Sequence, residues 1–184
     1  MRDFDPVRLG GHEADAWVAY YRRQWVAFLR AAVGMVRAGF GMSWPRTLRG
    51  AWWVLRANQA WAPFPRNDPD RARALMRAFY ADVARSSGAT FDPGRAADLE
   101  IAWWAAHRAV PHDGVDALVD ALTELYVYVY GVPRDAARPA ARHRADAMVI
   151  SDAWVAAGRD PADAAVAAER DELIKGYALL RAAR

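Results

Sequence analysis

Residues 92–109 read DPGRAADLEIAWWAAHRA, and this stretch decides the fold class of the chain. Aspartate followed by proline is a helix-start signal, because the carboxylate caps free backbone amides and proline suits the first helical turn. Behind it, the large apolar side chains recur every three or four residues, as they do on one face of an α-helix. The stretch therefore predicts a helix over 93–109.

The same signals recur along the rest of the chain. Asp-Pro pairs stand at 68–69 and 160–161, and glycines 88, 131 and 158 stand where helices are expected to end. The linkers between these signals are short, as in helical bundles, and 184 residues favour one domain with a sizeable core. We predict a single all-α domain over 1–184, a bundle of about seven helices with a tryptophan-rich core. The predicted helices cover 13–38, 43–61, 69–87, 93–109, 114–130, 134–157 and 161–183.

Composition limits the classes of protein to which the chain can belong. It is 54% hydrophobic and 26% charged, which predicts a globular protein rather than a disordered one. It contains no cysteine, which excludes disulfides, thiolate metal sites and cysteine nucleophiles. The N-terminus lacks the apolar core of a signal peptide, so we expect a cytoplasmic protein. Lys175 is the one lysine among 25 basic residues, a composition typical of a GC-rich bacterial genome.

Charge is unevenly distributed along the sequence. Residues 16–67 contain eight arginines, six of the nine tryptophans and no acidic residue, so the remainder is net negative although the whole chain carries +3. Such an asymmetry indicates either an anionic partner or two parts of the fold that attract each other.

Two eight-residue segments share one pattern, a polar residue at each end and a Trp-Trp pair in the middle. They are RGAWWVLR at 49–56 and EIAWWAAH at 100–107. On a helix, positions i, i+3, i+4 and i+7 share a face. One face would consist of Arg49, Trp52, Trp53 and Arg56, and the other of Glu100, Trp103, Trp104 and His107. If the two faces meet, they enclose a polar layer between four indoles.

The cationic face has several explanations. Arg49 and Arg56 can pair with acids from the net-negative remainder, since an unpaired buried charge is very costly. They can instead neutralise a small, partly apolar anion between walls formed by Trp52, Trp53, Trp103 and Trp104, because guanidinium groups bind planar anions and stack on aromatic rings. A membrane surface is a weaker alternative, and nucleic acid is disfavoured because no recognised nucleic-acid module is present. Binding of the small anionic or amphipathic ligand is the leading hypothesis.

Glu100 and His107 support the second hypothesis, that the protein is an enzyme that uses the same pocket. A buried carboxylate and imidazole have environment-tuned pKa values of the kind that acid–base catalysts use, with His107 as the base or acid and Glu100 as its electrostatic partner. The other explanation is a satisfied buried network without chemistry. No metal-site spacing is present, and no cofactor is identified. His107 is the candidate axial ligand if the pocket holds a heme.

The first predicted helix suggests a third class, a protein-interaction module. Arg23, Arg30 and Arg37 are spaced by seven residues and would form one stripe, which could dock an acidic partner or a second copy of the chain. Tyr20 and Tyr21 border the opposite face, where we favour packing over a pocket next to Glu13. On the 93–109 helix, Arg95, Asp98 and Arg108 are expected to face outward.

Overall fold

The helix that begins at the Asp92-Pro93 pair is α5 (Pro93–Asp113) of the computed structural model, which describes residues 4–184. The Asp92 carboxylate accepts a hydrogen bond from the Arg95 amide at 2.7 Å and so caps the first turn. Helix α4 (Pro69–Ser87) begins in the same way at Asp68. α5 continues past its predicted end at 109, because its last turn accommodates Pro111. The helix ends before Gly114.

Within residues 4–184 the chain forms eight α-helices and no strand, which confirms the all-α prediction. Residues 1–3 of the predicted domain lie outside the described residues. The six further helices are α1 (Pro6–Tyr21), α2 (Trp25–Phe40), α3 (Trp44–Trp61), α6 (Val115–Tyr130), α7 (Arg134–Ala156) and α8 (Ala164–Ala182).

The prediction of one helix over 13–38 is wrong, because the chain reverses between α1 and α2. Arg23 adopts the left-handed backbone conformation with φ of 59°, and the Gln24 amide bonds to the Ala19 carbonyl at 2.8 Å. This is the geometry of a helix C-cap, in which glycine or asparagine is the usual residue. Because the position is an arginine, no residue type in the sequence indicates a stop there. α1 also begins earlier than predicted, at an Asp5-Pro6 pair whose carboxylate caps it.

The helix predicted from 161 begins later, at Ala164. Asp160 does not cap it, because the Asp160 carbonyl accepts the Trp154 indole N–H and its carboxylate accepts the Ala162 amide in a separate turn. Asp163 caps α8 instead, with its carboxylate 2.8 Å from the Ala165 amide.

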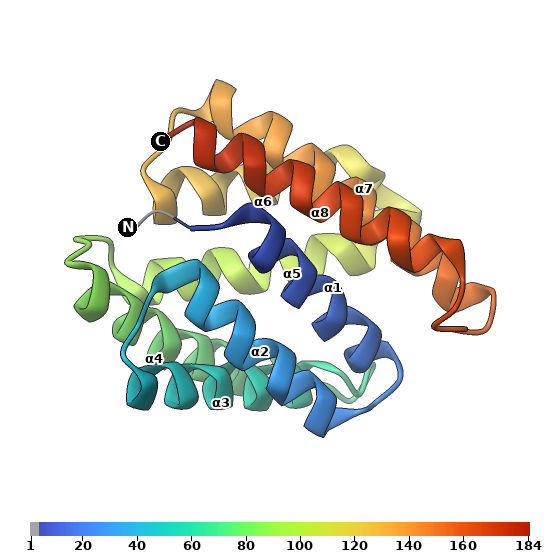
Figure 1. Cartoon of the computed structure of the whole chain (residues 1–184), viewed down its shortest axis with the longest axis horizontal. Helices are drawn as coiled ribbons and strands as arrows, with labels where there is room; N and C mark the ends of the chain where they lie inside the picture. The colour runs from blue at the N-terminus through green and yellow to red at the C-terminus, as the bar shows by residue number, and fades with distance from the viewer. Residues whose placement is uncertain (1–3) are drawn as a thin grey trace.

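The helices are arranged in a closed ring. Each packs against the helices next to it in the sequence, and α8 returns to pack against α1 (Figure 1). α4 therefore lies between α3 and α5, and α6 between α5 and α7. The interior of this ring is the hydrophobic core.

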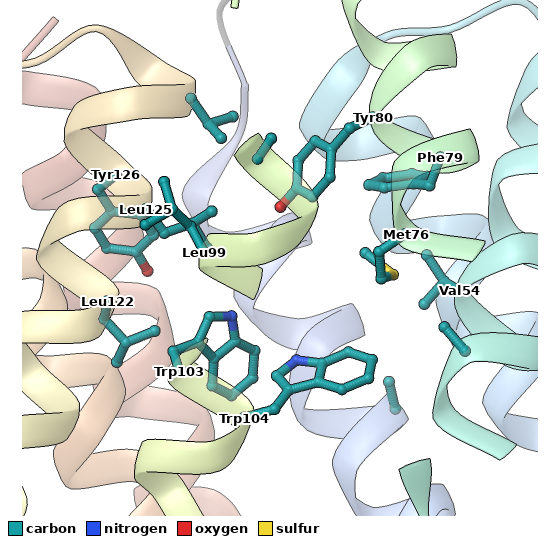
Figure 2. Packing of buried hydrophobic residues seen from close by; sticks show 14 of the residues in the cluster. Val54, Met76, Phe79, Tyr80, Leu99, Trp103, Trp104, Leu122, Leu125 and Tyr126 are labelled. Atoms are coloured by element: carbon teal, nitrogen blue, oxygen red, sulfur yellow. The ribbon is translucent and has the colours of Figure 1, made fainter. Parts of the chain in front are cut away.

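Four tryptophans, Trp61, Trp103, Trp104 and Trp154, are buried, which is roughly consistent with the predicted tryptophan-rich core. Trp103 and Trp104 both extend inward from α5, Trp104 on the side of Met76 and Trp103 on the side of Leu122 (Figure 2). Trp104 packs against Trp61 of α3, with ring centroids 5.5 Å apart. The indole layer thus joins α3 to α5 through Trp61 rather than through the paired tryptophans of α3.

Candidate functional site

The arginine face predicted on 49–56 lies on the outside of the ring. Arg49 makes a two-pronged ion pair with Asp82 of α4, with both N···O distances 2.7 Å. Asp82 is 1% exposed and also accepts a hydrogen bond from Arg85. Burial acts to raise the pKa of Asp82, but hydrogen bonds from Arg49 and Arg85 outweigh it, so this pKa lies below its ordinary value. Arg49 is therefore paired with an acid from outside residues 16–67, which is the first explanation given above for the cationic face.

The other members of this face do not reach the interior either. Trp52 is exposed, and the Arg56 guanidinium lies 5.7 Å from its ring centroid, within cation–π distance. Trp53 packs at the edge of the core. Because the α3 face points outward while Trp103 and Trp104 are buried, the two Trp-Trp faces do not enclose a layer between them.

The second face, by contrast, lines a large cavity. Glu100, Trp103, Trp104 and His107 all border a central space of about 480 Å³. Every helix of the ring contributes side chains to its wall. A volume of this size is within the range of small-molecule sites. Its lining includes a buried polar group around Glu13, which we call the inner end, and a partly exposed polar group around His107, which we call the outer end. Apolar side chains make up much of the rest, among them Phe28, Met35, Val54, Trp61, Met76 and Phe79.

The inner end contains a buried ion pair that connects α1 to α7. The Glu13 carboxylate accepts two hydrogen bonds from Arg144, one of them at 3.1 Å from Nε, and another from the Tyr177 hydroxyl of α8. The Arg144 guanidinium lies over the Trp103 ring, 4.7 Å from its centroid. Burial acts to lower the pKa of Arg144, but the charge of Glu13 outweighs it and holds this pKa well above its ordinary value.

Glu100 is the second acid at the inner end. Its carboxylate accepts hydrogen bonds from the Tyr80 hydroxyl at 2.7 Å and from the Trp104 indole at 3.2 Å. Burial raises the pKa of Glu100 above its ordinary value, and the charge of Arg144 opposes that shift only in part. The neighbouring Trp103 indole N–H is buried and has no hydrogen-bond partner among residues 4–184. This end of the cavity is thus rich in hydrogen-bonding groups.

His107 lies toward the outer end, and its partner is not Glu100. Its Nε2 is 3.0 Å from Oδ2 of Asp152 on α7. Tyr21 is close to the same carboxylate, and burial followed by the charge of Asp152 raises the pKa of its hydroxyl. Glu100 and His107 border the same cavity, and the imidazole pairs with Asp152, which joins α5 to α7. The sequence could not indicate this, because Asp152 is distant along the chain.

Arg108 also borders the outer end, although we expected it to face outward. Its guanidinium donates to the Trp61 carbonyl and stacks over the rings of Trp61 and Phe64, at 4.1 and 4.9 Å from their centroids. Burial lowers the pKa of Arg108, and the nearby charge of Arg23 acts in the same direction. Within residues 4–184, the ion pairs of the structure include neither Arg23 nor Arg108.

The predicted arginine stripe is interrupted by the turn between α1 and α2. Arg23 lies in that turn and donates to the Ala62 carbonyl at 3.3 Å. Arg30 is exposed on α2, and Arg37 near the end of α2 donates to the Met42 carbonyl. The three side chains therefore do not form a single helical stripe.

The inner residues that sequence reasoning missed come from several helices. Arg144, Tyr80 and Tyr177 have no common motif, and only the order of helices in the ring brings them together. Tyr20 and Tyr21, for which packing is the favoured prediction, line the cavity together with Glu13. Within the described residues, no group of three or more histidine or acidic side chains is placed to hold a metal ion. No helix in that part of the chain is long and apolar enough to cross a membrane.

Comparison of the chain with known protein families, with curated protein sequences and with solved structures finds no significant match.

Proposed function

We propose that the protein binds a small amphipathic molecule with an anionic group in the central cavity. The observation that carries the proposal is the cavity itself, about 480 Å³ in volume, with chemically different ends. Packed protein interiors leave few voids larger than a water molecule, so a space of this size needs an explanation beyond imperfect packing. Binding of a ligand is the explanation that its size and polarity favour.

The positive charge at the outer end of the cavity favours a ligand whose anionic group lies there. Arg108 borders the cavity, Arg23 lies close by, and both guanidiniums bond to backbone carbonyls at the end of α3 instead of to carboxylates. A guanidinium suits a carboxylate through paired hydrogen bonds. Arg108 thus takes the role that the sequence suggested for Arg49 and Arg56.

The apolar lining and the inner end of the cavity suit the rest of the proposed ligand. An apolar chain or ring would contact the side chains around Trp61 and Trp104, where each buried CH₂ is worth about 0.8 kcal/mol. At the inner end, the positive charge of Arg144 already has a carboxylate partner in Glu13. That end therefore suits an uncharged hydrogen-bonding group, such as a hydroxyl, near Glu100.

The proposal is tested by calorimetric titration with three probes that share a ten-carbon chain: decanoate, decanol and decylamine. We expect decanoate to bind most tightly. Arg108→Gln should weaken decanoate binding by about tenfold or more, with little effect on decanol, because a charge-assisted hydrogen bond is lost. Arg108→Lys should retain part of the preference for decanoate.

Two control variants separate this effect from general damage to the fold. Arg95 is exposed on the same helix and away from the cavity, so Arg95→Gln should bind all three probes as the wild type does. Arg49→Ala should also leave binding unchanged, because Arg49 pairs with Asp82 outside the cavity. Equal affinities of the wild type for decanoate and decylamine would contradict the proposed anionic group.

The His107–Asp152 pair favours a second candidate, an enzyme that moves a proton in the same cavity. The carboxylate can orient the imidazole, and an oriented imidazole suits a general base. We expect such an enzyme to hydrolyse an aryl ester that fits the cavity, such as p-nitrophenyl hexanoate. The rate should fall at least about a hundredfold in His107→Ala and remain unchanged in His112→Ala. Equal rates in the two variants would reject this function.

A further inference from the structure

The outer face of α3 carries three large apolar side chains that the cavity does not use. Trp44, Leu48 and Trp52 are spaced by four residues and are 59%, 54% and 46% exposed. Residues four apart lie on one face of a helix, so the three form a continuous row, which we call the α3 ridge. Scattered exposed apolar residues are ordinary, but a row on one face indicates a surface that is covered in use.

Arginines flank both ends of the α3 ridge. The Arg37 guanidinium lies 4.8 Å from the ring centroid of Trp44, and that of Arg56 lies 5.7 Å from the centroid of Trp52. Arg46 is exposed on the same helix, and Arg49 is also exposed, although Asp82 of α4 balances its charge. Because residues 16–67 contain no acid, neither α2 nor α3 offsets these charges with a carboxylate of its own. The face is therefore both apolar and cationic.

This charge pattern selects among the possible occupants. A second copy docked through the same face would place arginines against arginines, which is unfavourable. The occupant therefore needs negative charge together with a region that accepts indole rings. A bilayer surface of anionic lipids offers both, since tryptophan prefers the headgroup region and guanidinium groups pair with lipid phosphates.

Shape favours the bilayer over an acidic protein. The ridge is a row on one outward helix face, and its three side chains line neither the central cavity nor the smaller cavity between α7 and α8. A protein partner would need a groove complementary to two indoles, whereas the lipid headgroup region adapts to any convex surface. We propose that the α3 ridge is a peripheral binding site for an anionic lipid bilayer. The proposal does not depend on the ligand of the cavity.

Co-sedimentation of the full chain with lipid vesicles tests this site. We expect the wild type to bind vesicles of phosphatidylcholine with phosphatidylglycerol at least about tenfold more tightly than vesicles of phosphatidylcholine alone, and to lose that binding as salt increases. Leu48→Ser combined with Trp52→Ser should weaken binding by about tenfold or more, because two inserted apolar side chains are removed. Arg56→Glu should selectively reduce the preference for the anionic vesicles.

The matched control is Val149→Ser combined with Leu179→Ser, which removes two exposed apolar side chains from α7 and α8. This variant should bind vesicles as the wild type does. All variants alter exposed or half-exposed side chains, and thermal unfolding checks that they fold. The proposal is overturned if no vesicle binds, if the ridge and control variants bind equally, or if poly-glutamate binds through the ridge while vesicles do not.

Discussion

Among single residues, the buried carboxyl groups have the most distinctive environments. Glu13, Glu100 and Glu169 are all enclosed by the ring, but their partners differ. Glu13 accepts from a guanidinium and Glu100 from two neutral donors. Within residues 4–184, Glu169 accepts only from the Ser151 hydroxyl, and its second oxygen has no partner. Burial raises the pKa values of Glu100 and Glu169, whose donors are neutral groups, so these two hold their protons more tightly than ordinary carboxyl groups do.

Glu169 is expected to make the protein less stable as pH rises through neutrality. Burial raises its pKa from the ordinary 4.5 to about 7, so the folded state binds the proton more tightly than the unfolded chain does. The stabilisation is complete below about pH 4.5 and is lost as pH rises through about 7. Glu169→Gln imitates the protonated form and should remove this loss, on the order of 2–3 kcal/mol.

Urea unfolding of the wild type and Glu169→Gln at pH 5 and pH 8 measures this effect. Asp171→Asn, at an exposed position of the same helix, is the control. If the free energy of unfolding changes equally with pH in the wild type and Glu169→Gln, Glu169 is not the responsible group.

The Glu13–Arg144 pair is expected to be costly to break from one side. Glu13→Ala leaves a buried guanidinium without its carboxylate and should lower the free energy of unfolding by about 3–5 kcal/mol. Glu13→Leu combined with Arg144→Met should cost clearly less, since no charge then remains unpaired. Asp116→Asn, which breaks an exposed pair with Arg142, should cost less than about 1 kcal/mol. Similar costs for Glu13→Ala and Asp116→Asn would contradict this role.

Among the elements, helix starts were easier to predict than helix partners. Asp68 and Asp92 cap the helices that follow them, and such local contacts can be recognised in the sequence. The turn at Arg23 escaped prediction because its left-handed conformation is carried by an arginine. The inward face of α5 followed from its own periodicity, but the partner of His107 depends on which helix lies opposite. No pattern within one helix contains that information.

The contact between α1 and α8 closes the ring, and adjacent glycines test it. A Cβ atom on Gly10 would lie 2.9 Å from both the backbone nitrogen and Cγ1 of Ile174, so Gly10→Ala should lower the free energy of unfolding by about 2 kcal/mol or more. A Cβ on Gly11 would meet the terminal nitrogen of the long Arg170 side chain at 3.2 Å and no backbone atom of α8. Gly11→Ala should therefore stabilise α1 slightly, by about 0.5 kcal/mol.

Guanidinium chloride unfolding of the two alanine variants provides the comparison. Both substitutions change helix propensity by the same amount, so the difference between them reports the α1–α8 contact. Equal unfolding free energies would mean that α8 can move away from α1 at little cost.

For the whole molecule, the ring explains both the cavity and the surface charge. Each helix directs one face inward, so the ends of the cavity combine side chains that are far apart in the sequence, such as Glu13 with Arg144. Residues 16–67, which contain eight arginines, form one side of the ring. There Arg49 pairs with Asp82 of α4, and the α3 ridge remains exposed. The charge asymmetry of the sequence thus corresponds to the ion pair between α3 and α4 and to the exposed cationic surface around the α3 ridge.

Occupancy of the cavity by a small amphipathic anion is tested most directly by native mass spectrometry of the freshly purified protein, compared with its denatured mass. We expect an excess of mass that is lost on denaturation, or, if the ligand dissociates during purification, a one-to-one adduct on addition of decanoate that Arg108→Gln weakens. A protein that carries no bound molecule and forms no such adduct with decanoate, decanol or decylamine would contradict the proposed function.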